Sequence, residues 1–310
     1  MAPKKQTQDK NLRIVQLLTM AWNAKSVSRI ISITDQILEL NSNCVEALLL
    51  KADSIEDTNE RTQILLHALS AVEEPKNLIN PEEKNLFFMV LNHRLAYTYF
   101  LKENFDEAFK YCEQALNFVV EHESEIDYDD ELIGVVSQLK TLRYRILLRH
   151  EDWREILAQT MRDGDKTLAW AYSKLIAAWA TAGTNQRKSI CAPMFWDALM
   201  LAPDVPFYML GFFEEPDDDS DEEVLNDFEF ALMFYDVISI SNEFHDWFAR
   251  GTILFGLLSG RFENEEYEYM VDALDSFGGY IEYQHMRSLL TSTEDSEVIE
   301  TLAANKCLAE

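Results

Sequence analysis

The chain has 310 residues and carries 27 basic against 55 acidic side chains, a formal net charge of −28 at pH 7. This charge repels phosphate backbones and anionic lipid surfaces, so the composition argues against binding of bare nucleic acid or of a membrane. Apolar residues make up 47% of the chain, which is enough for a substantial core. Nine glycines and seven prolines are too few for a turn-rich all-β fold or a glycine-rich phosphate-binding enzyme.

The N-terminal residues 1–10 include three lysines and are expected to form a basic flexible tail. Residues 11–24 have the pattern of an amphipathic helix, and polar residues such as Arg13 and Asn23 make them too polar for the apolar part of a signal peptide. No apolar run approaches the roughly 18 residues that a membrane-spanning helix needs. The four cysteines are widely spaced, which indicates neither a zinc site nor a disulfide framework. These observations predict a cytoplasmic protein.

Helical periodicity dominates the chain. Ile30, Ile33, Ile37 and Leu40 recur at i, i+3, i+7 and i+10, which places them on one face of a helix. No alternating apolar and polar stretch of useful length predicts a strand. A second helical stripe consists of Ala108, Cys112, Ala115 and Val119. The sequence therefore predicts an all-α fold.

Helix starts are indicated by capping residues, in which a short polar side chain precedes a glutamate by three positions. The segment Asn80-Pro81-Glu82-Glu83 also places proline at the first helical position. Three further pairs have the same spacing: Asn43 with Glu46, Asp152 with Glu155, and Ser220 with Glu223. Such signals every 20 to 40 residues are typical of antiparallel helices joined by tight turns.

Two acidic segments interrupt the helical pattern, at residues 121–131 and 214–223. Self-repelling charge does not pack, so both are interpreted as solvated segments, with a docking strip for a basic partner as the alternative. Residues 214–223 are the predicted linker between an array of helices at 11–213 and a helical C-terminal cap at 224–310.

One segment carries a repeat motif, RLAYTYFLKENFDEAFKYCEQAL at residues 94–116. It resembles the tetratricopeptide repeat (TPR), a helix-turn-helix unit of 34 residues with small residues where its helices cross. The positions that carry the resemblance are Leu95, Ala96 and Tyr99 in the first helix, Phe105 before the second, and Ala108 and Ala115 within it. The resemblance implies antiparallel helix pairs stacked as a right-handed superhelix. Corresponding positions Ile37, Ala115 and Ala198 lie 78 and 83 residues apart, so the repeats are irregular.

A second segment, ALMLAPDVPFYMLG at residues 198–211, is similar to a signature of bacterial TPR proteins related to the suppression-of-tumorigenicity family. The matching positions are Pro203, Val205, Pro206, Tyr208, Leu210 and Gly211. Asp204 stands where that signature has histidine. The resemblance implies architecture and supplies no catalytic residues.

Motifs for chemistry are largely missing from the sequence, since no nucleotide-binding, nucleophile-elbow or zinc-protease pattern occurs. Glu282 and His285 have the i, i+3 spacing of two metal ligands, but a di-iron bundle needs a second such motif, so a surface helix pair is the preferred interpretation. We expect no catalytic residues, no metal and no cofactor.

A partner-binding surface is expected on the first helix of the best repeat, where His93, Tyr97 and Phe100 should face the concave groove, although Phe100 could equally belong to the core. The basic residues Lys140, Arg143, Arg145, Arg149 and Arg154 form a cluster. Within it Arg145 and Arg149 share a helical face and suit anion recognition, with pairing to nearby acidic segments as the alternative.

The sequence thus predicts a non-enzymatic helical-repeat scaffold that binds a protein or peptide, of basic or amphipathic character, in its concave groove. The alternative is an acidic regulator that mimics nucleic acid and occupies basic surfaces of nucleic-acid-binding proteins. An enzyme without a recognisable motif is a third possibility.

Overall fold

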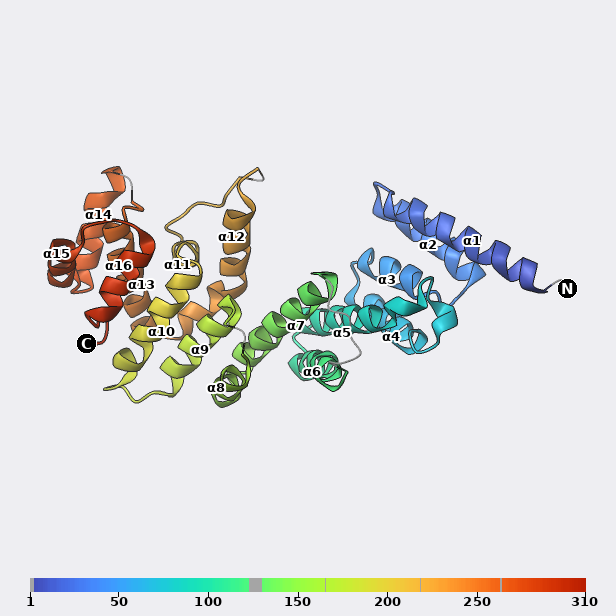
Figure 1. Ribbon diagram of the computed structural model, residues 1–310, viewed down its shortest axis with the longest axis horizontal. Coiled ribbons are helices and arrows are strands. Elements are labelled where there is room, and N and C mark those ends of the chain that lie inside the picture. Colours follow the sequence, from blue (N-terminus) through green and yellow to red (C-terminus); the bar gives the residue numbers. More distant parts are fainter. Residues whose placement is uncertain (1–2, 123–129, 165, 218, 263) are drawn as a thin grey trace. The chain divides into compact units, whose positions relative to one another are not determined.

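The computed structural model describes residues 3–122, 130–164, 166–217, 219–262 and 264–310, and within these ranges the side chains of 3–9, 130, 236, 237, 239 and 264 are not described. The described residues form sixteen α-helices and three short 3-10 helices and contain no strand (Figure 1). The all-α prediction is therefore confirmed for this part of the chain. None of these helices is long and apolar enough to cross a membrane. The chain packs as two units, residues 1–146 and 147–310.

The first unit contains seven helices, the last of which continues into the second unit. In chain order they are α1 (Pro3–Trp22), α2 (Val27–Leu40), α3 (Val45–Asp53), α4 (Thr58–Ala71), α5 (Lys84–Leu101), α6 (Phe105–Glu121) and α7 (Asp130–Arg149), with η1 (Pro75–Asn77) and η2 (Pro81–Glu83) before α5. Neighbouring helices pair in sequence, α1 with α2, α3 with α4 and α5 with α6, and each pair also contacts the next (Figure 1).

The predicted apolar stripe lies on α2, where Ile33 and Ile37 are buried, whereas Ile30 is half-buried and Leu40 is 38% exposed. Ile33 and Ile37 belong to a small core shared by α1, α2 and the start of α3. A larger core extends from α3 to α7 and contains Leu95, Ala96 and Ala108. The first unit is therefore held together by consecutive helix pairs, since each pair buries its apolar face against the next.

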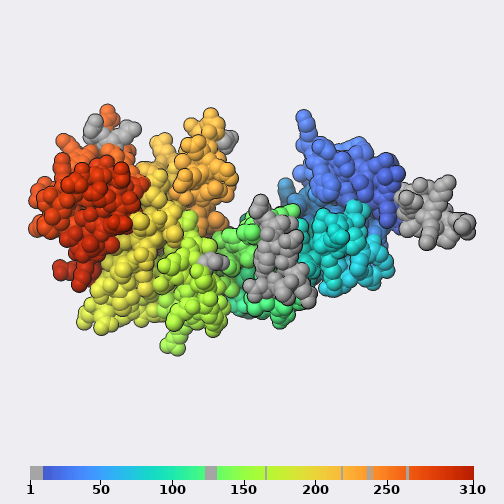
Figure 2. Space-filling model, viewed as in Figure 1, coloured from blue at the N-terminus to red at the C-terminus, as the bar shows by residue number. Residues whose placement is uncertain are grey.

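The second unit contains the remaining helices. They are α8 (Trp153–Arg162), α9 (Leu168–Thr181), α10 (Arg187–Leu201), α11 (Val205–Met209), α12 (Glu222–Phe234), η3 (Tyr235–Ile240), α13 (Asn242–Ser259), α14 (Asn264–Ser276), α15 (Tyr280–Leu289) and α16 (Asp295–Ala304). Helix α13 contacts α14, α15 and α16, and α16 also packs against α10 (Figure 1). In the space-filling view, α14–α16 form a continuous red-orange mass of side chains (Figure 2).

The core of the second unit is rich in aromatic rings. The ring of Trp179 in α9 lies 4.8 Å from that of Trp247 in α13, measured between centroids. Phe195 in α10 contacts both Trp247, at 5.6 Å, and Phe248, at 5.2 Å. Because α9, α10 and α13 share these buried rings, the C-terminal helices are part of the same core as the helices that precede residues 214–223.

Side-chain caps explain several helix starts, and two of the predicted caps are not formed. Asp152 caps α8 by accepting the N–H of Glu155, and Asn80 caps η2 by accepting the N–H of Glu82. The predicted caps Asn43 and Ser220 are wrong, because α3 begins after Cys44 and α12 begins after Asp221.

The contacts of Glu46 explain why the predicted capping box does not form at the start of α3. The Glu46 carboxylate accepts the backbone N–H of Ile79 at 2.6 Å, from a segment 33 residues further along, and also the Cys44 thiol. It is buried, and burial raises its pKa. The carboxylate thus binds a distant segment and does not complete a local capping box.

The structure describes the second acidic segment more fully than the first. Residues 123–129 of the first lie outside the described residues. In the second, 214–217 and 219–221 are not helical, and they connect α11 to α12, which pack against each other. This connection lies within the second unit, whereas the division between units follows Ile146.

Candidate functional site

The helix pair α5–α6 carries the repeat motif, and its small residues are fully buried. Ala96 in α5 and Ala108 and Ala115 in α6 have no exposed surface, as expected where two helices approach closely. Leu95 is also fully buried. Tyr99 stacks on Tyr111 across the pair, with ring centroids 5.5 Å apart and planes inclined by 4°. The pair is thus fixed by small residues at the crossing and by stacked rings beside it.

The three residues predicted to bind a partner also lie on α5. His93, Tyr97 and Phe100 recur at i, i+4 and i+7, so they lie along one face of the helix. Tyr97 is 39% exposed, whereas His93 and Phe100 are half-buried. Phe100 lies 5.7 Å from Phe105, the residue that begins α6. This face therefore combines one exposed ring with two rings that are partly held by packing.

His93 is neutral at physiological pH. Burial lowers its pKa from 6.5 to about 4, and the neighbouring Arg94 adds to the shift. Arg94 in turn pairs with Asp53 at the end of α3, with 3.2 Å between Nε and Oδ1. The ring of His93 therefore acts as a hydrogen-bonding aromatic group without charge.

Arg145 in α7 lies over the ring of Phe100, with its guanidinium carbon 4.8 Å from the ring centroid. A guanidinium at this distance is attracted by the ring face. The structure thus brings together two residues that the sequence could only propose separately. Arg149 is exposed, four residues further along α7, and belongs to the second unit.

One member of the predicted basic cluster, Arg143, is buried. Arg143 is 6% exposed, lies 3.7 Å from the carboxylate of Glu113 in α6, and stacks over Tyr144. It is therefore a packing residue between α6 and α7, as the alternative of internal pairing predicted. Arg154 is exposed at the start of α8 in the second unit.

The proline-containing signature lies at α11 in the second unit. Pro203 stands in the turn after α10, and Pro206 is in the first turn of α11, where its missing N–H costs no hydrogen bond. Gly211 follows the helix with a φ of 70°, a left-handed conformation that favours glycine. Tyr208 is half-buried and contacts Phe228 of α12 at 5.5 Å. These residues shape the turn before α11, its start, its end and its packing against α12.

Asp204, the residue that replaces histidine in the signature, forms an ion pair that sequence reasoning missed. Its carboxylate lies 2.7 Å from Nε of Arg261, and both oxygens of Asp295 accept hydrogen bonds from the same guanidinium. Arg261 is mostly buried and lies over the ring of Phe255. The three residues come from segments 57 and 34 positions apart, so no local spacing could have indicated the cluster.

Glu282, which with His285 has the spacing of two metal ligands, makes other contacts. Glu282 accepts a hydrogen bond from Arg250 at 2.7 Å and one from the backbone N–H of Leu308. His285 is exposed. In the described part of the chain, no three His, Cys, Asp or Glu residues are grouped so that they could hold a metal ion.

The four cysteines are all free and buried. Burial raises the pKa of each thiol to about 12, so the thiolate that nucleophilic chemistry or metal binding requires is disfavoured at neutral pH.

No family model, curated protein or solved structure matches the chain. The resemblances to TPR proteins and to the suppression-of-tumorigenicity family therefore stay predictions from the sequence motifs.

Proposed function

We propose that the chain is a non-enzymatic scaffold of TPR-like repeats that binds a protein or peptide partner on the exposed face of α5. The observation that carries the proposal is that His93, Tyr97 and Phe100 recur along one face of α5 and that Arg145 of α7 lies over the Phe100 ring. Tyrosine and arginine are the side chains that most often dominate the binding energy of protein interfaces. The exposed Tyr97 ring and the Arg145 guanidinium over Phe100 supply both types.

The arrangement of the first unit supports the repeat architecture. Its helices pair in sequence, and the motif alanines of the α5–α6 pair are fully buried. Stacked pairs of this kind expose one helix of each pair along an extended surface, which suits a partner segment several residues long. The net charge of −28 favours a basic or amphipathic partner.

The test is affinity purification of the full chain from its native host, with wild type compared with Tyr97→Ala and with Arg145→Gln. Tyr269→Ala is the matched control, because Tyr269 is 71% exposed on α14 in the second unit. We expect a partner that wild type and the control both retain and that Tyr97→Ala binds at least about thirtyfold more weakly. Equal recovery by all four chains would refute the α5 face as the binding surface.

The alternative function, a mimic of nucleic acid, rests on the net charge alone. The two proposals predict different salt dependence. A partner bound through many charges loses affinity steeply between low and physiological salt, whereas a partner bound through the aromatic face of α5 loses little. Titration of the purified partner at three salt concentrations separates them.

A further inference from the structure

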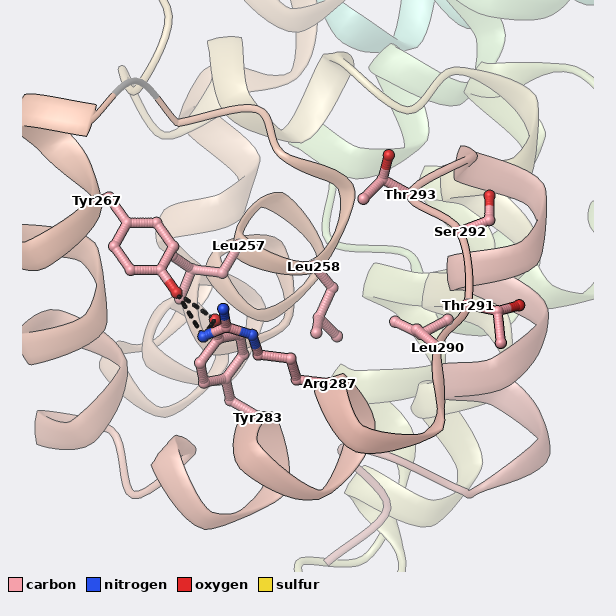
Figure 3. Close-up of a pocket in the computed structure, with 9 residues that line it drawn as sticks. All are labelled: Leu257, Leu258, Tyr267, Tyr283, Arg287, Leu290, Thr291, Ser292 and Thr293. Atoms are coloured by element: carbon pink, nitrogen blue, oxygen red, sulfur yellow. Dashed lines mark hydrogen bonds between the residues drawn. The ribbon is translucent and has the colours of Figure 1, made fainter.

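The second unit contains a pocket with a volume of about 550 Å³, and no residue of the proposed α5 surface lines it. It lies between the end of α13, helices α14 and α15, and the connection from α15 to α16 (Figure 3). This volume is within the usual range of small-molecule sites.

One side of the pocket is apolar. Leu257 and Leu258 at the end of α13 are 7% and 5% exposed, and the ring of Tyr283 is 3% exposed. All three line the pocket and leave only a small surface accessible. An apolar group placed here would remove that surface from water at little conformational cost, because the side chains are already packed.

The other side carries a charged hydrogen-bonding group. Arg287 of α15 donates hydrogen bonds of 3.3 Å to the phenol oxygens of both Tyr267 and Tyr283, and the two phenols hydrogen-bond each other (Figure 3). The guanidinium also lies over the Tyr283 ring, 6.0 Å from its centroid. Tyr267 comes from α14, so two helices hold this group in place.

Arg287 differs from the better-buried arginines of the same unit in its partners. Arg250 pairs with Glu282, and Arg261 pairs with two aspartates. Among the described residues, Arg287 hydrogen-bonds only the two phenols. It is exposed, so its charge is accessible from solvent while its position is fixed by the tyrosines.

The hydrogen bonds among Arg287, Tyr267 and Tyr283 leave N–H and O–H donors available to a ligand. Two phenols that hydrogen-bond each other use one O–H hydrogen, and the other remains free to donate. Burial raises the pKa of Tyr283 to about 12, so this phenol keeps its proton at neutral pH. Across the pocket, Ser292 accepts the N–H of Glu294 at 3.0 Å, which leaves its own O–H hydrogen free. The guanidinium retains further N–H groups.

We propose that this pocket binds a monoanionic carboxylate carried on an apolar group, with the carboxylate at Arg287 and the apolar group against Leu257 and Leu258. The guanidinium fork matches a carboxylate through two parallel hydrogen bonds. A doubly charged phosphate fits less well, because the pocket supplies a single positive charge within a chain of net charge −28. This site shares no residue with the proposed partner surface on α5 and goes beyond that function.

Two sources can supply such a ligand, a free apolar acid and the C-terminus of a peptide. Isothermal titration of the full chain at low ionic strength uses octanoate for the first and N-acetyl-Ala-Ala-Leu for the second. Octanamide, which keeps the apolar chain and lacks the charge, and inorganic phosphate are the comparisons. We expect one of the two carboxylates to bind, and the tighter one identifies the source.

Three variants test the residues. Arg287→Gln removes the charge and should weaken binding at least about tenfold, and Tyr267→Phe, which keeps the ring and removes one hydroxyl, should weaken it by a smaller factor. Arg154→Gln makes the same change of charge at an exposed position of α8 and should bind as wild type does. Unchanged thermal midpoints show that the variants fold.

Several outcomes would overturn the assignment. They are failure of both carboxylates to bind wild type, equal binding of octanamide, tighter binding of phosphate, or unchanged affinity in Arg287→Gln. Loss of binding in Arg154→Gln would also overturn it, because that result would indicate attraction by charge alone.

Discussion

Gly256 offers a sharp test of the packing in the second unit, because helix propensity and packing predict opposite effects for Gly256→Ala. The residue lies inside α13, and its backbone has no unusual φ. A β-carbon added there would lie 2.6 Å from Cε2 of Phe262 and 2.7 Å from Cε1 of Phe207. Optimal carbon–carbon separation is about 3.5–4.0 Å, so both rings would have to move by about 1 Å.

The magnitude follows from what holds these rings. Phe207 is fully buried and stacks on Phe213 with 4.8 Å between centroids, while Phe262 lies 5.8 Å from Phe207. Overpacking of such a site costs about 1–3 kcal/mol. Alanine in place of glycine within a helix gains about 1 kcal/mol. Because two rings must shift together, the upper part of the packing range applies, and we expect a net destabilisation of about 1–2 kcal/mol.

Urea denaturation followed by tryptophan fluorescence measures this change well, because five of the six tryptophans lie in the second unit. Gly134→Ala is the control. Gly134 lies in α7 with no atom within 4 Å of its added β-carbon, so it should stabilise the first unit by about 0.5–1 kcal/mol when followed by circular dichroism. A Gly256→Ala chain as stable as wild type, or more so, would show that Phe207 and Phe262 do not pack against α13 as described.

Three further substitutions test the electrostatics and the helix crossing. The wild-type chain should lose at most about 3 kcal/mol of stability as pH falls from 6.5 to 4, because the folded-state pKa of His93 is about 4 and the buried ring resists protonation. His93→Gln should remove this loss. Urea midpoints across this range measure the difference in slope. Asp227→Asn should act in the opposite sense, since burial and then the nearby Asp204 and Glu223 raise the pKa of Asp227 to about 6. Ionisation of this carboxyl therefore costs stability as pH rises from 4 to 6, and the variant should be more stable by about 1–2 kcal/mol at pH 7.5 and unchanged at pH 3.5. Ala108→Trp should destabilise the first unit by about 1–3 kcal/mol or more, and an unchanged melting temperature would contradict the repeat register at that position.

The helices were predictable where one short-range rule decided the structure. The apolar stripe of α2 and the buried alanines of the α5–α6 pair follow from helical periodicity and from the small size required at a crossing. Asp152 caps α8 by accepting the N–H of Glu155, as this short-range rule predicts. At Asn43 the same rule failed, since Asn43 Oδ1 is hydrogen-bonded to the His67 ring, 24 residues away, and Glu46 binds the backbone of Ile79.

The candidate sites were less predictable because their residues come from separate helices. The face of α5 follows from helical spacing, yet the position of Arg145 over Phe100 depends on how α7 packs beside it. Arg287 and Tyr267 lie on different helices and are 20 residues apart. Neither residue belongs to a motif, so only the packed structure places a guanidinium, two phenols and three leucines around one pocket.

The last prediction concerns a chain shortened to residues 1–215, which removes α12–α16. Trp179 and Phe195, on α9 and α10, are at most 1% exposed and pack against Trp247 of α13. The backbone of the C-terminal residues also accepts indole hydrogen bonds, from Trp196 to Cys307 at 3.4 Å and from Trp247 to Leu308 at 3.0 Å.

Each uncovered aromatic side chain exposes on the order of 100–200 Å² of apolar surface, which costs about 2.5–5 kcal/mol per ring. Two such rings amount to a large part of the stability of a typical domain, which is about 5–15 kcal/mol. The shortened chain should therefore bind a hydrophobic dye, elute as oligomers in size-exclusion chromatography and melt at a lower temperature than the full chain. A monomeric chain of unchanged thermal stability would mean that α9 and α10 need no cover, and that the helices after residue 215 form an independent domain.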